Sequence, residues 1–218
     1  MSSTKIGNVT INWLGHSGFM IEGEGKTIYI DPYVLPEDVG FEDMADIILI
    51  THEHYDHCNP EAIRKLRKED TTTLIPESCS LKFRGDARNV IEGDVLTGGL
   101  AIKDMDIEVV PAYNINKPNH PKGFGVGYII KVEGIRIYHA GDTDLIPEMN
   151  EINADVALLP IGGNYTMDET EAAEAAAVIA PKVVIPMHYN YLETTRADAG
   201  KFKKMVNDKN PDIEVLIL

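Results

Sequence analysis

The chain has 218 residues and a formal net charge of −15 at pH 7, with 44% hydrophobic and 25% charged residues. This length and composition fit one globular domain, residues 1–218, with a sizeable core. No nucleic-acid partner is expected, because phosphate backbones are bound by basic surfaces. No apolar stretch approaches the ~20 residues that span a bilayer, and no signal-like core follows the first residues. We therefore expect a cytoplasmic protein without membrane contact.

Short apolar or alternating runs along the chain predict a series of strands. These runs lie at residues 9–14, 19–22, 27–30, 47–50, 72–75, 90–91, 100–103, 107–110, 128–132, 135–138, 156–159, 183–186 and 214–218. The glycine-containing segments 23–26 and 133–134 are expected to join neighbouring strands as hairpins. Strand-forming sequence therefore covers most of the chain.

Amphipathic patterns predict helices between these strands, at residues 60–68, 76–83, 168–180 and 195–207. Asn59 precedes a proline at the first helix start, and Asp168 begins the third helix, so both are expected to act as N-caps. The polar segment 112–125 is expected to be an ordered loop over a functional site. Strands punctuated by helices indicate an α/β (α+β) fold with two sheets faced by outer helices.

The segment 51–57, Thr-His-Glu-His-Tyr-Asp-His, places four candidate metal ligands directly after a buried-strand pattern. Side chains two residues apart in extended backbone point to the same side, so His52 and His54 can converge on one ion. Asp56 and His57 follow in the turn and can reach a second ion nearby. Imidazole and carboxylate ligands suit zinc first, with manganese, iron or cobalt as alternatives.

Three later residues at predicted strand ends are further candidates. Asp142 follows Gly141 and could bridge two ions, although an aspartate after glycine is most often a turn residue. His188 ends a buried strand, where a lone histidine is more often a hydrogen-bonded core residue. Asp31 could orient a histidine as a hydrogen-bond acceptor. Cys58 could add a soft ligand, but a buried thiol without such a role is the stronger interpretation.

Six segments together carry a resemblance to a known family. They are residues 13–19 (WLGHSGF), 31–32 (DP), 52–57 (HEHYDH), 138–143 (YHAGDT), 159–163 (LPIGG) and 186–189 (PMHY). In these segments the sequence resembles the metallo-β-lactamase superfamily, in its branch of small metal-dependent hydrolases related to ascorbate-6-phosphate lactonase. The resemblance covers nearly the whole chain. It implies a four-layer αβ/βα sandwich, with the site at one edge of two packed sheets.

The resemblance also implies two divalent ions and their ligands, with zinc the first choice and manganese or iron as alternatives. The implied ligands are His52 and His54 for the first ion, Asp56, His57 and His188 for the second, and Asp142 between the two.

One position departs from the family pattern. The third histidine for the first ion normally follows a Val-Pro-Ala strand end, where this chain has Asn114. His120, six residues later in the same loop, could take over that role. His16, in the first turn, is another candidate ligand or a group that supports one. His139 is expected to be buried and structural.

The resemblance implies hydrolysis of a small ester, lactone or phosphoester by a water molecule that the two ions activate. Asp56 or Asp142 could hand on the proton, and His16 could act beside them. Other candidate substrate contacts in predicted loops are Lys117, Asn164, Tyr165 and Asn190. The substrate is expected to be a small molecule, anionic or neutral, and the protein could be a homo-oligomer. The alternatives are a phosphodiesterase, a one-iron enzyme that oxidises thiols or persulfides, and a metal-binding scaffold without activity.

Overall fold

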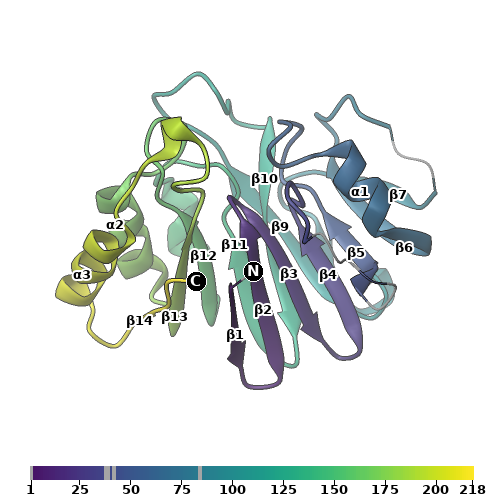
Figure 1. Ribbon diagram of the computed structural model, residues 1–218, viewed down its shortest axis with the longest axis horizontal. Helices are drawn as coiled ribbons and strands as arrows, with labels where there is room; N and C mark the ends of the chain where they lie inside the picture. Colours follow the sequence, from purple (N-terminus) through teal and green to yellow (C-terminus); the bar gives the residue numbers. More distant parts are fainter. Residues whose placement is uncertain (1, 37–39, 41–42, 83–84) are drawn as a thin grey trace.

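The computed structural model describes residues 2–36, 40, 43–82 and 85–218, which form two mixed seven-stranded sheets (Figure 1). In spatial order, the first sheet contains β1 (Ser2–Ile6), β2 (Val9–Gly15), β3 (Gly18–Gly23), β4 (Lys26–Ile30), β5 (Ala45–Leu49), β6 (Arg67–Pro76) and β7 (Ala87–Val90). The second contains β8 (Val95–Leu96), β9 (Asp106–Ala112), β10 (Gly125–Val132), β11 (Ile135–His139), β12 (Val156–Pro160), β13 (Val183–Met187) and β14 (Glu214–Val215). Within each sheet, every strand pairs with its neighbours in sequence, which keeps the connections local.

Each sheet is antiparallel in one half and parallel in the other. In the first sheet β1 to β4 pair antiparallel and β4 to β7 pair parallel. In the second, β8 to β11 pair antiparallel and β11 to β14 pair parallel. Both predicted hairpins are confirmed, between β3 and β4 and between β10 and β11. Carboxyl ends of parallel strands meet at one edge of a sheet, which is where open α/β folds place their sites.

The continuous apolar run at β5 reflects burial on both faces of the first sheet. Ile47 and Leu49 face the core between the two sheets, whereas Ile48 faces the outer core beneath α1 (Pro60–Leu66). Ile63 and Leu66 of α1 complete that outer core. Since successive side chains of a strand point to opposite faces, a strand covered on both sides needs apolar residues at every position.

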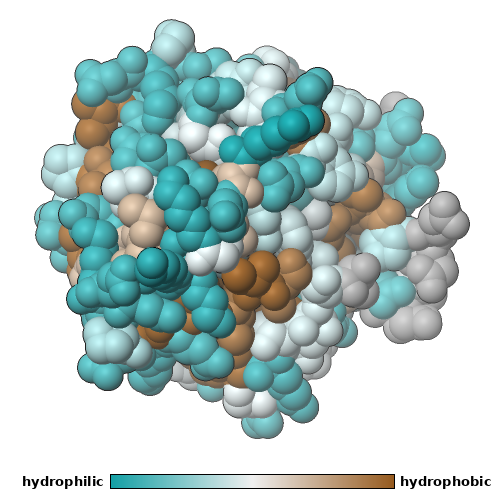
Figure 2. Space-filling view, turned by 60° about the vertical axis from the view of Figure 1, so that its left-hand side comes forward, coloured by the Kyte–Doolittle hydropathy of each residue, from teal (hydrophilic) through white to brown (hydrophobic). Residues whose placement is uncertain are grey.

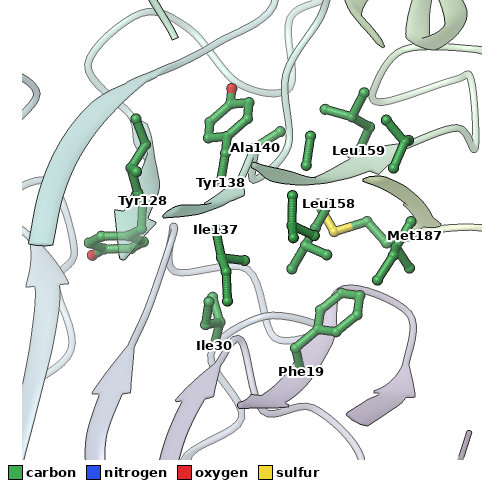
Figure 3. Packing of buried hydrophobic residues seen from close by; sticks show 14 of the residues in the cluster. Phe19, Ile30, Tyr128, Ile137, Tyr138, Ala140, Leu158, Leu159 and Met187 are labelled. Carbon is green, nitrogen blue, oxygen red and sulfur yellow. The ribbon is translucent and has the colours of Figure 1, made fainter. Parts of the chain in front are cut away.

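The main core lies between the sheets and joins their inner faces (Figure 3). Phe19 and Ile30 from the first sheet point toward Ile137, Leu158 and Met187 of the second, and all five side chains are fully buried. Burying large apolar side chains is the dominant favourable contribution to folding. This shared core fixes the two sheets against each other and so fixes the strand ends that carry the candidate site.

Helices cover the outer faces of both sheets (Figure 1). The helix α1 lies against the first sheet, and α2 (Glu169–Ile179) and α3 (Ala199–Lys209) pack together against the second. Asn59 accepts hydrogen bonds from the first turn of α1, and Asp168 forms a capping box at the start of α2, as expected. The predicted α/β fold, with two packed sheets between outer helices, is confirmed.

The face that carries α2 and α3 is largely hydrophilic, and its hydrophobic residues are gathered in small separate patches (Figure 2). In α2 the alanines Ala172, Ala173 and Ala176 are buried, while Glu174 on the other side of the helix is exposed. Small side chains allow the helix to lie close to the sheet. No helix in the described ranges is long and apolar enough to cross a membrane.

Several predicted elements in the first half differ from the structure. The first helix ends at Leu66 rather than residue 68, because the chain turns into β6, where the Thr71 hydroxyl donates a hydrogen bond to the Ala45 carbonyl. The predicted helix 76–83 is absent over its described part, where residues 77–82 form a turn and loop; Phe83 lies outside the described residues.

The predicted strand at 100–103 is also wrong. In its place are a 3-10 turn, η2 (Gly98–Leu100), and a single bridge between Ile102 and Met105. The last helix was expected from residue 195, but Thr195 closes the 3-10 turn η4 (Glu193–Thr195) and α3 begins only after its cap, Asp198. The edge strand β1 was not predicted, because its polar sequence lacks an apolar pattern.

Candidate metal centre

The candidate ligands meet where several strands end. Asp31 directly follows β4, His52 and its neighbours follow β5, Asp142 follows β11, and His188 follows β13. His120 comes from the loop between β9 and β10. This loop was predicted as an ordered segment over the site, and residues 113–124 form it.

The first cluster contains three histidines. The ligand nitrogens of His52, His54 and His120 all lie within 4.8 Å of one another. Nε2 of His52 is 3.0 Å from Nδ1 of His54, which is 3.2 Å from Nε2 of His120. His120 therefore stands where the third nitrogen of the first site was sought.

The second cluster contains His16, Asp56, His57 and His188, again with ligand atoms within 4.8 Å of one another. Nε2 of His16 lies 2.9 Å from Oδ2 of Asp56, and Nε2 of His57 lies 3.8 Å from the same oxygen. His16 had been considered as a ligand in the first site; the structure places it in the second cluster instead. The reason is the turn after β2, where the His16 carbonyl accepts a hydrogen bond from the backbone of His188.

Asp142 lies between the two clusters. Its Oδ1 is 3.3 Å from Nε2 of His57, and its Oδ2 is 3.1 Å from Nε2 of His188 and 3.4 Å from Nε2 of His120. One buried carboxylate therefore approaches ring nitrogens from both groups. This is the position that the resemblance implied for a bridging ligand.

The chemistry of these groups fits a bound cation. Among the described residues, Nε2 of His57 and Oδ1 of Asp142 are buried polar atoms without a hydrogen-bond partner. An unsatisfied buried polar atom costs about 1–3 kcal/mol, which a cation between these two atoms would offset. Imidazole nitrogen with carboxylate oxygen is a donor set that suits zinc and its neighbours.

The protonation states of the buried groups also suit metal binding. Burial lowers the pKa of His52 well below its ordinary value, which keeps a nitrogen lone pair free. Burial opposes ionisation of Asp142, but the neighbouring His188 and His57 hold its pKa well below the usual range. Burial likewise disfavours charge on His57, yet Asp142 and Asp31 outweigh it and raise the pKa of His57. A cation would take over the role of that proton.

Asp31 orients His57 as expected. Its Oδ2 lies 2.7 Å from Nδ1 of His57, and both side chains are fully buried. The backbone and hydroxyl of Thr51 donate further hydrogen bonds to Asp31, at 2.8 and 2.6 Å. Because a carboxylate only accepts, His57 carries its proton on Nδ1 and directs Nε2 toward Asp142 and Asp56.

A second buried network supports His120. Oδ1 of Asn114 lies 3.0 Å from Nδ1 of His120, and the Asn114 amide donates to Oδ1 of Asp144 and to the Tyr165 carbonyl, both at 2.9 Å. Lys117 donates to the same Asp144 oxygen at 2.6 Å. This arrangement places the proton of His120 on Nδ1 and turns its Nε2 toward His54 and Asp142.

The clusters form the floor of a cavity of about 350 Å³. Its lining consists of His54, Tyr55, Asp56, Asn119, His120, Asp142, Tyr165, His188, Leu192 and Thr194. Four of these were not predicted, namely Tyr55, Asn119, Leu192 and Thr194. Tyr55 is part of the histidine segment itself, so its position there was a usable signal. The other three come from irregular loops, whose path no periodic pattern reveals.

Of the candidate substrate contacts, Tyr165 lines the cavity and the others do not. Asn164 donates to the Thr194 carbonyl at 2.7 Å, and Asn190 donates to the Ala197 carbonyl at 2.9 Å. Both amides therefore hold loops together. Lys117 is occupied by the network around Asp144, and His16 is fully buried beneath the cavity.

Two other residues behave as structural groups. His139 is fully buried, and its Nε2 donates to the Ser17 carbonyl at 2.9 Å while its Nδ1 accepts from the backbone of Gly141. Cys58 packs in the outer core beneath α1, where burial raises the pKa of its thiol. It belongs to neither cluster among the described residues.

Comparison with known proteins gives the family. Residues 10–188 match the family described as the Beta-lactamase superfamily domain. The UPF0173 metal-dependent hydrolase TK0141 of Thermococcus kodakarensis is 38% identical, over 96% of each chain. The solved structure of Igni18, a metallo hydrolase from Ignicoccus hospitalis, is 32% identical with a TM-score of 0.79, covering 96% of this chain and 94% of that one. A structure from Parabacteroides distasonis has a TM-score of 0.83 at 36% identity, covering 99% and 96%.

The matching segments of the sequence, the two-sheet sandwich and the histidine–aspartate centre at its edge thus agree with these similarities. The chain belongs to the metallo-β-lactamase superfamily and, within it, to the UPF0173 family of metal-dependent hydrolases.

Proposed function

We propose that the protein is a hydrolase with a two-metal centre. His52, His54 and His120 would hold the first ion, Asp56, His57 and His188 would hold the second, and the Asp142 carboxylate lies between the two groups. The observation that carries this proposal is the position of the Asp142 carboxylate, within 3.4 Å of ring nitrogens from both clusters. Zinc is the first choice of metal, with manganese or iron as alternatives.

Bound divalent ions would make a water molecule acidic enough to attack near neutral pH and would polarise the oxygen of the scissile group. The residues of the chain supply the rest. Burial opposes ionisation of Asp56, but the hydrogen bond from His16 and the charge of His57 together outweigh it and lower the pKa of Asp56, so this carboxylate is ionised. Asp56 lines the cavity with about a quarter of its side chain exposed, so its ionised oxygens are available to the second ion.

The small cavity supports a small-molecule substrate, and we propose an ester or lactone ahead of a phosphoester. The resemblance to the branch of ascorbate-6-phosphate lactonase favours carboxylic ester chemistry. A phosphodiester is the second choice on the same machinery. The observation that His120 completes the first cluster favours an active enzyme over a scaffold that has lost its first site.

The test begins with elemental analysis of protein purified without added metal or chelator. About two zinc or manganese ions per chain support the dinuclear hydrolase, and a panel of esters, lactones and phosphodiesters follows. About one iron per chain would instead favour oxidation of thiols or persulfides. A protein that neither retains nor takes up metal would refute the proposal.

A pair of variants in one loop tests the assignment of ligands. His54→Ala should reduce the number of bound ions and abolish turnover while the circular dichroism spectrum is retained. Glu53→Ala is the matched control, because Glu53 is the neighbouring residue and accepts hydrogen bonds from Ser80 outside the cavity. Equal metal content in the two variants would mean that His54 is not a metal ligand.

A further inference from the structure

The wall of the cavity above the two clusters carries no charge in the described part of the chain. Beyond the histidines and aspartates of the centre, its lining consists of Tyr55, Asn119, Tyr165, Leu192 and Thr194. These are two phenols, an amide, a hydroxyl and an aliphatic side chain. They offer apolar surface and neutral hydrogen-bonding groups to whatever is attached to the reacting bond.

Two cations near the cavity, within the part of the chain that the structure describes, have carboxylate partners. Nζ of Lys117 lies 2.6 Å from Oδ1 of Asp144 and 2.8 Å from the Thr166 carbonyl. Arg196, two residues after the lining residue Thr194, lies 3.4 Å from Glu193. A bound anion would have to compete with Asp144 for Lys117, and Arg196 is not a lining residue of the cavity.

The rim beside the second cluster is aromatic. The rings of Tyr33 and Tyr55 pack edge to face with centroids 5.8 Å apart, and Tyr33 makes the same contact with Tyr191. Tyr55 is 60% exposed and Tyr191 is 44% exposed. Exposed aromatic side chains at the mouth of a concave site commonly provide contact surface for a ligand.

We propose that the site takes a substrate whose part beyond the hydrolysed group is uncharged and apolar or aromatic, and that it selects against a second anionic group. This inference rests on the proposed function for the position of the reacting group. An anionic group that leaves water for the wall finds no lysine or arginine among the described lining residues, and burying an unpaired charge is costly. The net charge of −15 adds long-range repulsion.

This selectivity separates the chain from enzymes that act on phosphorylated lactones, the class that the name ascorbate-6-phosphate lactonase implies. A phosphate remote from the lactone would lie against the uncharged wall. The two metal ions attract the reacting group itself, so the discrimination acts on the remainder of the molecule. The substrate class is therefore a neutral ester or lactone with an apolar or aromatic substituent.

A matched pair of metal-binding probes tests the wall without requiring turnover. Hexanohydroxamic acid and the monohydroxamic acid of adipic acid have the same chain length and the same metal-binding group, and only the second ends in a carboxylate. Calorimetric titration of zinc-loaded protein should give a dissociation constant for the carboxylate compound that is at least about tenfold higher than that of the neutral compound. Equal or tighter binding of that compound, or failure of both to bind, would overturn the inference.

Two lysine variants with equal net charge separate a local effect from a global one. Thr194→Lys adds a cation to the wall and should improve binding of the carboxylate probe about tenfold, with little change for the neutral probe. Val178→Lys adds the same charge at a 40% exposed position on α2 and should leave the ratio unchanged. The same improvement in both variants would attribute the selectivity to net charge and overturn the role of the wall.

Hydrolysis of 4-nitrophenyl hexanoate and mono-4-nitrophenyl adipate, each corrected for its spontaneous rate, provides the link to function. A higher kcat/KM for the hexanoate supports both proposals. If the hydroxamates bind with the expected ratio but no ester or lactone is hydrolysed, the proposed function fails and the inference about the wall remains. If esters are hydrolysed with equal kcat/KM and the probes bind equally, the function remains and the inference fails.

Discussion

Oδ1 of Asn114 accepts a hydrogen bond from Nδ1 of His120 over 3.0 Å, and both side chains are buried. Asn114 stands where a histidine ligand was expected from the family pattern. In this chain it contacts His120, the histidine that we propose as the ligand in its place. The amide group of Asn114 is fixed in turn by Asp144 and the Tyr165 carbonyl, so its oxygen is the end directed at the ring.

Replacement of Asn114 should therefore weaken the first metal site without removing a ligand. Asn114→Ala frees the ring of His120 to rotate and to change tautomer, and we expect about a 10- to 100-fold loss of affinity for one of the two ions. Competition with a chromophoric chelator measures this change. Asn164→Ala is the control, since Asn164 also bonds a backbone carbonyl in a nearby loop. Equal affinities in both variants would mean that Asn114 does not orient His120.

Asp31 should play the corresponding part in the second metal site. Asp31→Asn keeps the size of the side chain but weakens the acceptor that holds Nδ1 of His57, so the second ion should bind about 10- to 100-fold more weakly. Asp46→Asn is the control, because Asp46 lies in β5 and accepts bonds from Thr27 and Lys68 outside the site. Metal titration of both variants measures the affinity for each ion. If Asp31→Asn still binds two ions as tightly as the unsubstituted protein, the prediction is wrong.

A tight backbone contact places His188. A Cβ added at Gly162 would overlap the carbonyl oxygen of His188, so one of the two chain segments must move. Gly162→Ala should lower the midpoint of thermal unfolding by several degrees and weaken the second metal site, because His188 is displaced.

The neighbouring glycine provides the control for this prediction. Gly163 has a φ of +76°, but a Cβ there would meet only the Cβ of Asp168, at 3.9 Å. Gly163→Ala therefore carries a backbone cost of about 1 kcal/mol without displacing His188. Metal affinity should fall in Gly162→Ala and not in Gly163→Ala. The same affinity in both would show that the contact at Gly162 does not position His188.

The parts of the site that follow regular elements could be predicted from the sequence. His52, Asp142 and His188 each lie just after a strand with a clear apolar pattern, and strand ends in such sheets converge. His120 could only be proposed as an alternative, because its approach to His54 depends on the path of an irregular loop fixed by Asn114. Leu192 and Thr194 were not predicted for the same reason.

Strands and helices could be predicted where burial imposes a regular pattern of apolar residues on the sequence. Elements without such a pattern were missed. The strand β5 is buried on both faces and reads as a continuous apolar run. The strand β1 pairs with β2 through its backbone, and its side chains are mostly exposed, so its sequence carries little signal. The segment 77–82 has a helix-like composition, but its Ser80 donates to Glu53 of the histidine segment and the chain remains irregular.

Asp155 should make the stability of the protein depend on pH. Its carboxylate accepts hydrogen bonds from the backbone of Arg136 at 3.0 Å and from Lys182 at 2.8 Å. It therefore ties the start of β11 and the residue before β13 to the residue before β12. The Arg136 backbone and Lys182 lower the pKa of Asp155 in the folded protein. A group with a lowered folded pKa stabilises the fold above its unfolded pKa of about 3.9, and this contribution is lost as the pH falls through the folded value.

Asp155→Asn should therefore reduce the free energy of unfolding by about 1 kcal/mol at neutral pH, since the charged acceptor is replaced by a neutral one. Urea unfolding from pH 8 to pH 3 should show a constant difference from the unsubstituted protein above about pH 5, which narrows below about pH 4. Asp104→Asn, in a turn where the described structure gives the side chain no hydrogen bond, is the control and should show no difference. A difference for Asp155→Asn that persists unchanged at pH 3 would mean that its charge does not stabilise the strand ends.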